Sequence, residues 1–403
     1  MTVSLFLFDD PEDTPRFAPF SQSRPIGELR YGAWLIRERA AQALGIEVAG
    51  HVSAAHLSRF TEPGAPPVVA DAGTQGTRVV LRSTFIPDRS QPDMARLAAS
   101  RPLHLADAGG ADIGYVLPPG AALPLGVPAD WDTLTLQGRR LIGAWQIIGD
   151  LTAVMRGDLE AARERTTGRA PQGATVIGDA SLVLVDDGAT IEPLAVFDTR
   201  NGPVWIRTGA DVRSGSRLAG PLIVGEHARI VGGQLRESSI GPRCVVHGEV
   251  SNSVFIGYAN KAHDGFLGHS IVGRWANLGA GTITSNLKNT YGSVRLNLGA
   301  ERVETGMMFL GSLVGDHVKT AIGTMLPTGC MLGTGANVFG TRRPESFVPA
   351  FAWGTDEPGR RMACRMFLQT ASRVLPRRDV AFDDATAAFL TDIWQHTTGQ
   401  TCD

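Results

Sequence analysis

The spacing of hydrophobic residues along the 403-residue chain changes near position 170. Before that point, aliphatic and aromatic runs such as VSLFLF at 3–8 are separated by stretches whose apolar residues recur at helical spacing. The runs predict buried strands, and the stretches 26–44, 94–100 and 139–165 predict helices. Residues 1–170 are therefore expected to form an α/β domain.

After position 170, aliphatic residues recur every six positions and are often followed by glycine or a small polar residue. The uninterrupted part of this ladder consists of Ile206, Val212, Leu218, Val224 and Ile230. Such a period is typical of a left-handed parallel β-helix, in which each aliphatic side chain points into a triangular prism. Residues 171–345 are expected to form this β-helix. Loss of the period between 281 and 312 predicts an inserted loop.

The six-residue period stops near position 345, and the remaining residues 346–403 predict a short helical tail. Residues 360–375 and 383–397 both carry apolar residues at helical spacing, and Asp383 or Asp384 is a suitable N-cap for the second helix. A β-helix needs a cap because its last coil would otherwise present an open edge. We expect the tail to cover the last coil or a neighbouring subunit.

Composition narrows the class of protein. The formal charge of −2 gives no reason to expect a nucleic-acid partner, and no apolar run of about 18 residues is present to span a membrane. The start, MTVSLFLFDD, lacks the basic segment of a signal peptide. The cysteines are scattered without a CxxC pair, which predicts neither a zinc site nor a disulfide and suits a cytoplasmic location. They are Cys244, Cys330, Cys364 and Cys402.

Lysine is almost absent from the chain. Lys261, Lys288 and Lys319 are its three lysines, and the other 35 of the 38 basic residues are arginine. A compact ammonium and a planar guanidinium are not interchangeable, so a lysine kept against this bias is a candidate for a role that arginine cannot fill.

Residues 256–289 carry a motif with a histidine, an aromatic residue, Leu-Gly and a run N-x-G-A-G-T-I-T-x-N. The matched positions are His263, Phe266, Leu267, Gly268, Asn277, Gly279, Ala280, Gly281 and Asn286. The segment resembles the acetyltransferase site of the bifunctional UDP-N-acetylglucosamine pyrophosphorylase/glucosamine-1-phosphate N-acetyltransferase family. The order of an α/β half and a β-helix resembles that family too, in its variant branch of sugar nucleotidyltransferases.

The resemblance implies an acetyl-CoA-dependent acyl transfer with His263 as general base, because neutral imidazole suits deprotonation of an amine near neutral pH. The backbone amides of Gly279, Ala280 and Gly281 would face the acyl-CoA and its oxyanion. The residues expected to bind the sugar phosphate or nucleotide sugar are Lys261, Phe266, Asn277, Asn286 and Lys288. A homotrimer is expected from the β-helix class, with acyl-CoA sites between neighbouring subunits.

The motif departs from the family at two positions. Phe266 and Leu287 stand where the bifunctional enzymes usually have tyrosines, so two substrate-positioning hydroxyls are lost. The amino-sugar acceptor of the family is therefore not assured for this chain. His269, six residues after His263, is expected to be an incidental surface residue.

The N-terminal half lacks the glycine-rich phosphate loop of sugar nucleotidyltransferases, since its first glycine is Gly27 and no lysine precedes Lys261. Arginine pairs well with phosphate, so Arg16, Arg24 and Arg30 are the candidates for nucleotide binding. Hard oxygen ligands suit Mg²⁺, and the candidates are Asp9, Asp10 and Asp150. Two hypotheses stay open: an active domain that converts an NTP and a sugar 1-phosphate into NDP-sugar and pyrophosphate, or a degenerate domain.

Two alternatives compete with the transferase. One is a trimeric binding or scaffold protein with a vestigial nucleotide-sugar pocket. The other is a β-helix zinc carbonic anhydrase, which binds Zn²⁺ through three histidines from neighbouring subunits. Its candidate ligands are His227, His247, His263 and His269. Their spacing lacks the close histidine pair of that class, and the GAGTIT run would have no role in it.

Overall fold

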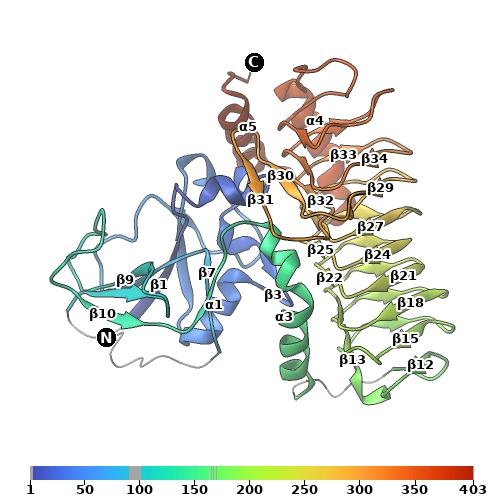
Figure 1. The fold of residues 1–403 in the computed structure, drawn as a ribbon, viewed down its shortest axis with the longest axis horizontal. Helices are drawn as coiled ribbons and strands as arrows, with labels where there is room; N and C mark the ends of the chain where they lie inside the picture. Colours follow the sequence, from blue (N-terminus) through green and yellow to red (C-terminus); the bar gives the residue numbers. More distant parts are fainter. Residues whose placement is uncertain (1–2, 90–100, 165, 167, 169, 403) are drawn as a thin grey trace.

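The computed structural model describes residues 3–89, 101–164, 166, 168 and 170–402. An α/β domain lies beside a tall parallel β-helix, and two C-terminal helices lie at the upper end of the β-helix (Figure 1). This is the architecture that the hydrophobic pattern predicted. The helix expected at 94–100 lies outside the described residues.

The N-terminal domain is built on a seven-stranded sheet in the order β10-β8-β9-β6-β1-β4-β5. Strand β9 runs antiparallel to its neighbours β6 and β8, and the remaining pairs are parallel. The strands are β1 Val3–Phe8, β4 Val48–Val52, β5 Val68–Val69, β6 Thr77–Arg82, β8 Leu103–Ala106, β9 Asp112–Leu117 and β10 Asp132–Thr135; β7 Phe85–Pro87 pairs with β11 Gly138–Arg140.

The single helix predicted over 26–44 is wrong in its first half. A hairpin of β2 (Arg30–Tyr31) and β3 (Trp34–Leu35) precedes helix α1 (Ile36–Leu44). Gly32 makes the turn with φ of +69°, a left-handed conformation that suits glycine. The helix predicted over 139–165 is present as α3 (Trp145–Arg163), which continues through Gly149, but Arg139 and Arg140 belong to strand β11 instead.

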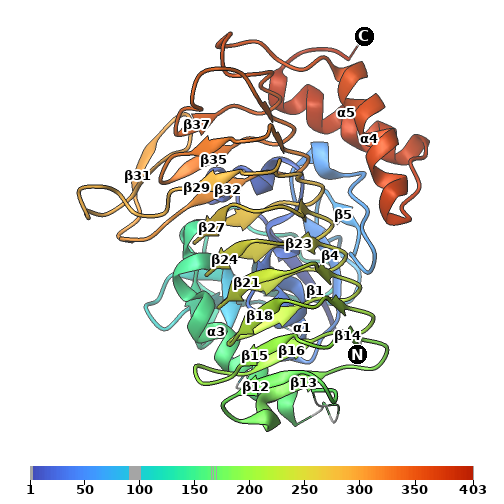
Figure 2. The ribbon, with the colours of Figure 1, turned by 90° about the vertical axis from the view of Figure 1, so that its right-hand side faces the viewer.

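The β-helix presents three parallel sheets (Figure 2). The open face consists of β12 Thr175–Ile177, β15 Val196–Asp198, β18 Ser216–Ala219, β21 Gly233–Arg236, β24 Glu249–Ser251 and β27 Phe266–Gly268, with β29 Ile283–Thr284 and β34 Met325–Leu326 above it. The domain face consists of β13 Val183–Val185, β16 Val204–Ile206, β19 Leu222–Val224, β22 Ser239–Ile240, β25 Val254–Phe255, β28 Ile271–Val272, β32 Ser312–Val314, β35 Cys330–Leu332 and β37 Phe347–Val348. The tail face consists of β14 Thr190–Ile191, β17 Asp211–Val212, β20 Arg229–Ile230, β23 Val245–Val246, β26 Asn260–Lys261, β33 Lys319–Thr320 and β36 Asn337–Val338.

The six-residue ladder forms the interior of the prism, as predicted. All five residues from Ile206 to Ile230 are fully buried in one core. The domain face is also apolar on its outside, where Trp205, Ile223, Val254 and Ile271 join a second core with α3 and the loop after β1. The N-terminal domain is therefore fixed along one side of the β-helix by a continuous hydrophobic interface.

The interruption of the period between 281 and 312 contains a β-hairpin of β30 (Arg295–Asn297) and β31 (Arg302–Glu304). Val294 and Leu296 bury their side chains in the core shared with α3. The inserted loop predicted from the sequence is thus a structured arm that reaches toward the N-terminal domain (Figure 1).

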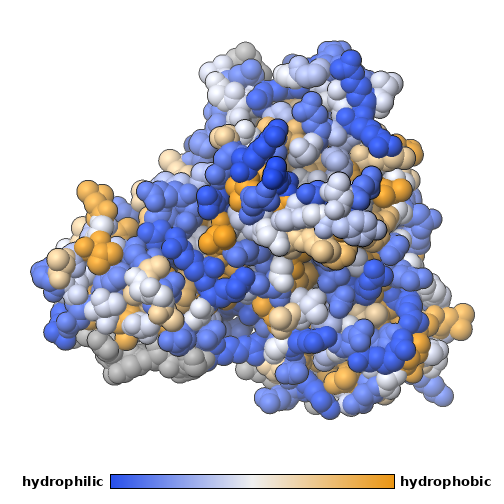
Figure 3. All heavy atoms as spheres, in the orientation of Figure 1, coloured by the Kyte–Doolittle hydropathy of each residue, from blue (hydrophilic) through white to orange (hydrophobic). Residues whose placement is uncertain are grey.

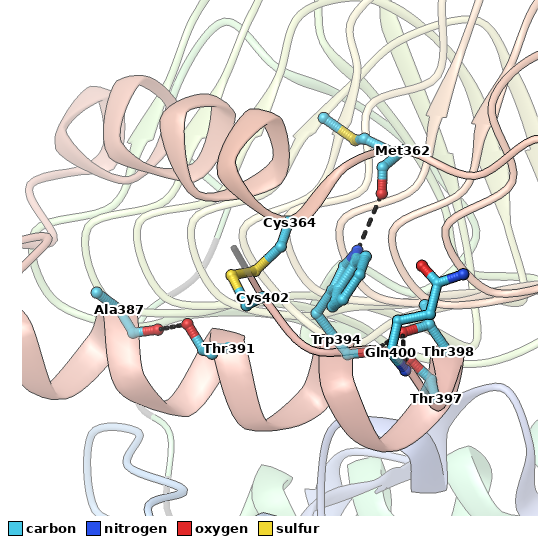
Figure 4. Close-up of a disulfide and its surroundings, with 9 residues drawn as sticks. All are labelled: Met362, Cys364, Ala387, Thr391, Trp394, Thr397, Thr398, Gln400 and Cys402. Carbon is cyan, nitrogen blue, oxygen red and sulfur yellow. Dashed lines mark hydrogen bonds between the residues drawn. A yellow bond between two sulfur atoms is a disulfide. The ribbon is translucent and has the colours of Figure 1, made fainter.

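The C-terminal tail contains α4 (Cys364–Val374) and α5 (Asp384–Thr398), and Asp383 caps α5 by accepting from the backbone N–H of Thr386 at 2.8 Å. A disulfide joins Cys364 to Cys402, with their Cα atoms 5.3 Å apart (Figure 4). The expectation of no disulfide was wrong, because α5 and the residues after it return the chain to the start of α4. No helix among the described residues is long and apolar enough to cross a membrane.

Candidate active site

His263 lies at the edge where the tail face turns into the open face, between β26 and β27. Its side chain is exposed, and the next residues up this edge are Ala280 and then Ile322. The imidazole is therefore accessible to a molecule that runs along the edge. Its backbone carbonyl accepts a hydrogen bond from the Lys261 ammonium at 2.9 Å.

Lys261 is not available to bind a sugar phosphate, which corrects the expectation from the sequence. It pairs in register with Val246, an interior position, and its side chain is 2% exposed. Its Nζ donates to the carbonyls of His247 and His263, both at 2.9 Å. Burial lowers the pKa of this ammonium to about 8. Lys261 therefore fastens two successive turns from inside the prism.

The Gly279–Gly281 run forms a turn of the coil on the same edge as His263. The N–H of Gly279 donates to Thr320 Oγ1 at 3.0 Å, and the N–H of Gly281 donates to the carbonyl of Asp264, also at 3.0 Å. A Cβ on Gly279 would approach the Thr320 carbonyl to 2.6 Å. These two amides hold the coil together, which corrects their assignment to an oxyanion site.

An exposed apolar strip follows the His263 edge toward the C-terminal coils, and the sequence analysis missed it. The strip consists of Ile283, Ile322, Met325 and Phe339, whose side chains are 43%, 83%, 51% and 39% exposed. A cleft of about 140 Å³ runs beside it and is lined by Arg342 and Arg343. Figure 3 shows hydrophobic residues at the surface along this right-hand side of the β-helix. The signal was present in the sequence as apolar residues outside the interior ladder.

Asn286 lies at a different edge, where the open face turns toward the domain face. Its Nδ2 is 2.8 Å from Nδ1 of His269, and the His269 ring stacks on Phe309 with a centroid distance of 5.2 Å. Burial lowers the pKa of His269 to about 4, so its ring is neutral at pH 7. His269 is therefore a partner of Asn286 and not the incidental surface residue that the sequence suggested.

Asn277 lies on the tail face of the β-helix. Its Oδ1 accepts from Asn260 Nδ2 at 2.8 Å, and both residues line a pocket together with Lys319. The structure thus places Asn277, Asn286 and His263 on three different parts of the prism. Phe266 stands on the open face, and Lys288 is half-buried in the inserted arm.

The N-terminal arginines are engaged in contacts within the protein. Arg24 is 2% exposed and is paired with Asp316 and Glu62 at 2.7 and 3.0 Å. Arg16 pairs with Glu301 of the inserted arm. Arg30 donates from Nη1 to the backbone carbonyl of Ala33 at 2.6 Å. The structure therefore does not gather these three side chains into a phosphate site, which corrects that prediction.

The three aspartates expected to hold Mg²⁺ do not fit that ion. Asp9 is buried beneath Ser53 and the loop after β1, and burial raises the pKa of its carboxyl group. Asp10 is paired with Arg82, and Asp150 accepts from the Tyr31 hydroxyl at 2.8 Å. Each carboxylate has its own partner in a separate place. The three aspartates therefore do not form the magnesium site that the sequence suggested.

The histidines considered for zinc are also dispersed. His227 lies between the domain and tail faces, His247 and His263 lie on the edge between the tail and open faces, and His269 lies on the third edge. Across the described part of the chain, no three His, Cys, Asp or Glu side chains are arranged to hold a metal ion. One chain therefore does not build the carbonic anhydrase site.

Residues 5–104 match the family model described as sugar nucleotidyl transferase. A curated bifunctional sugar-1-phosphate nucleotidylyltransferase/acetyltransferase from Sulfurisphaera tokodaii is 31% identical over 91 residues, which are 23% of each chain. Residues 5–104 are therefore similar to sugar nucleotidyl transferases, and part of the chain is similar to bifunctional nucleotidylyltransferase/acetyltransferases. The protein named bifunctional protein GlmU from Bordetella parapertussis is 30% identical over 206 residues, which cover 45% of this chain and 42% of that relative.

The chain therefore matches less than half the length of these curated relatives. A solved acetyltransferase domain of PglB from Neisseria gonorrhoeae, in complex with acetyl coenzyme A, aligns over 83% of this chain and 97% of its own. Its sequence identity is 13% and its TM-score is 0.20. The β-helix is accordingly assigned from the strands, registers and interior ladder of this chain.

Proposed function

We propose that the protein transfers an acetyl group from acetyl-CoA to an amine of a sugar phosphate or nucleotide sugar. The observation that carries the proposal is the exposed His263 within the matched motif, at the lower end of the apolar strip. The match of residues 5–104 to the sugar nucleotidyl transferase model supports a transferase, and the strip and its neighbouring arginines support a long donor with an apolar arm and phosphates.

His263 acts as the general base. The acceptor nitrogen attacks the thioester carbonyl and forms the new C–N bond, while neutral imidazole takes the proton that the nitrogen loses. The tetrahedral intermediate then breaks its C–S bond, and His263 returns the proton to the departing thiolate. The products are the N-acetylated acceptor and free CoA, so protons and charge balance over one turnover.

The acyl-CoA would lie along the His263 edge. Its pantetheine arm would pack on Ile322 and Phe339, because these exposed side chains offer an apolar surface beside the coil turns. Arg342 and Arg343 would bind its phosphates, since guanidinium groups form charge-assisted hydrogen bonds to phosphate oxygens.

A complete site requires a second copy of the chain. His263 and Asn286 occupy different edges of the same prism, so one substrate molecule cannot touch both from a single coil. In a trimer, the Asn286 edge of one subunit can face the His263 edge of the next. We therefore propose a homotrimer whose acyl-transfer sites are shared between subunits.

The test is release of free CoA from acetyl-CoA in the presence of amino-sugar phosphates. His263→Ala is expected to lower kcat at least 100-fold, because a general base contributes about 10²- to 10⁴-fold. His227→Ala is the matched control, since His227 is an exposed histidine at another edge. Equal activity of His263→Ala and the control would refute the assignment of the base.

Nucleotidyl transfer by the N-terminal domain is the second candidate function, and the family match over residues 5–104 favours it. Its test is pyrophosphate release from NTPs and sugar 1-phosphates with added Mg²⁺. Arg24, Asp10 and Asp150 already have partners within the protein. Acetyl transfer is therefore better supported than nucleotidyl transfer. No release across the common NTPs and sugars would leave a degenerate domain that supports the β-helix.

A further inference from the structure

A pocket of about 230 Å³ lies between the tail face of the β-helix and the end of α4. We call it the tail pocket. It is lined by Tyr258, Asn260, Trp275, Ala276, Asn277, Lys319, Val374, Arg377 and Arg378. The β-helix supplies the floor, and the chain's own C-terminal tail supplies the two arginines. It is separate from the apolar strip, which follows the His263 edge and shares none of these lining residues.

The tail pocket is positively charged and none of its lining residues is acidic. Lys319 is fixed there, because its Nζ donates to the carbonyls of Trp275 and His317 at 2.9 and 3.0 Å. Arg377 and Arg378 form no salt bridge within the described residues. The neighbouring Asp379 has an 85% exposed side chain that pairs with Arg243 instead. Three cationic residues therefore line this pocket, and none of its lining residues carries a carboxylate.

Lys319 and Arg378 are partly buried, whereas Arg377 is exposed. Burial lowers the pKa of the Lys319 ammonium to about 8, and burial also lowers the pKa of Arg378, with Arg377 adding to the effect. The Arg378 guanidinium donates from Nη1 to the backbone carbonyl of Arg377 at 3.3 Å and from Nη2 to Asn260 Oδ1 at 3.5 Å, and its buried Nε has no partner among the described residues. A bound anion would offset the repulsion between Arg377 and Arg378 and accept their hydrogen bonds.

The rest of the tail pocket suits a sugar. Asn260 and Asn277 are joined by one hydrogen bond of 2.8 Å, which leaves amide capacity for ligand hydroxyls. Tyr258 and Trp275 form an aromatic wall with a centroid distance of 4.5 Å, against which the C–H face of a sugar ring can pack. The volume is sufficient for a phosphate group and part of one ring.

We propose that the tail pocket binds the phosphate of a phosphorylated sugar acceptor through Arg377 and Arg378. The acceptor role rests on the proposed acyl transfer. Asn260 and His263 belong to the same coil and are three residues apart, a separation of about 10 Å along an extended chain. A sugar phosphate spans most of that distance, so a phosphate held in the pocket would direct the sugar toward the His263 edge. The tail would then select phosphorylated over free sugars.

The first experiment measures binding alone, by calorimetry with inorganic phosphate, glucosamine 1-phosphate and unphosphorylated glucosamine. The wild type should bind both phosphates and prefer the sugar phosphate, while glucosamine should bind at least tenfold more weakly. The Arg377→Gln/Arg378→Gln variant should lose about tenfold or more in affinity for both phosphates, because hydrogen bonds to charged groups are the strong ones. Arg373→Gln, an exposed arginine of the same tail, should bind like wild type.

Two results of this calorimetry would overturn phosphate binding in the tail pocket. Wild-type levels of binding in the double variant, or no binding of either phosphate by the wild type, would overturn it. If the double variant does not fold, Asn277→Asp tests the same claim by placing a carboxylate in the pocket, and unchanged phosphate affinity would again overturn it.

A kinetic measurement then separates this proposal from the proposed acyl transfer. The double variant should raise KM for the phosphorylated acceptor and leave KM for acetyl-CoA unchanged. Phosphate binding without any acetyl transfer would refute the proposed function but keep the anion site. Transfer with an unchanged acceptor KM in the double variant would refute the acceptor role of the pocket.

Discussion

Replacement of Arg24 by alanine is expected to weaken the fold strongly, although the sequence suggested a nucleotide-binding role for this residue. Arg24 is buried between the N-terminal domain and the β-helix, where its Nε and Nη2 donate to Asp316 Oδ2 at 3.1 and 2.7 Å. The same side chain donates to both carboxylate oxygens of Glu62, at 3.0 and 3.2 Å. The substitution would therefore leave two carboxylates with unmet hydrogen bonds.

The size of the expected loss in unfolding free energy follows from the burial of Asp316. The Asp316 side chain is 4% exposed, so after Arg24 is removed its charge would keep only the hydrogen bonds from the Ser23 hydroxyl and the N–H of Arg274. Breaking a buried ion pair by deleting one partner costs about 3–5 kcal/mol. The pair of Arg59 and Asp392 provides a matched control, because its N–O distance is 2.6 Å but the arginine is 56% exposed. An exposed pair contributes about 0.2–1 kcal/mol, so Arg59→Ala should have a small effect.

The assay is urea unfolding followed by tryptophan fluorescence, with the free energy of unfolding compared among wild type, Arg24→Ala and Arg59→Ala. The double variant Arg24→Met/Asp316→Asn should be less destabilised than the sum of its single variants, because it removes both charges together. The hypothesis of a structural ion pair would be refuted if Arg24→Ala cost no more than Arg59→Ala. A loss of NTP binding without a loss of stability would instead restore the role predicted from the sequence.

The remaining predictions concern the tail, acid stability, the shared site and Lys261. Cys402→Ser opens a loop of 38 residues and should lower the unfolding free energy by up to about 4 kcal/mol, and reducing agent should have the same effect on the thermal midpoint of the wild type only. His317 has a folded pKa of about 3, mainly through burial, against 6.5 unfolded, so the unfolded state takes up its proton first as pH falls. Through His317, the free energy of unfolding should fall by about 1.4 kcal/mol for each pH unit below 6.5. His317→Asn should remove that slope in denaturant titrations at pH 5–7. Mixed trimers of His263→Ala and Asn286→Ala chains should recover acetyl transfer that neither variant has alone, whereas no recovery would argue against shared sites. Lys261→Met should retain the acceptor KM of the wild type, and a rise of tenfold or more would return Lys261 to the substrate site.

The sequence predicted the β-helix well because its signal is local and repeated. Each coil must place an aliphatic side chain inside the prism, so the ladder from Ile206 to Ile230 appears as a period that no distant contact can change. The 26–44 stretch failed because a hairpin at Gly32, which packs against α3, overrides its helical spacing.

The side chains that the sequence assigned incorrectly all depend on distant partners. Lys261 looked like a phosphate ligand because of its chemical type, but its register with Val246 turns it into the prism. The bond between Cys364 and Cys402 depends on how α5 folds back, which cysteine spacing does not reveal. Residue type and spacing therefore suggest which groups could carry chemistry, whereas the packing of separate elements decides whether those groups face the solvent or the protein.

The loop after β1 attaches the N-terminal domain to the β-helix. In sugar nucleotidyltransferases this loop wraps the nucleotide phosphates, whereas here it is attached to the turns of the β-helix. Ser23 donates to Asp316 at 2.8 Å, Gln22 accepts from the N–H of Thr334 at 3.0 Å, and the carbonyl of Pro19 accepts from the Thr334 hydroxyl at 3.1 Å. A nucleotide that recruited Arg24 from this loop would have to break its buried contact with Asp316. Nucleotide binding there and attachment of the domain to the β-helix therefore oppose each other, and the buried ion pair favours attachment.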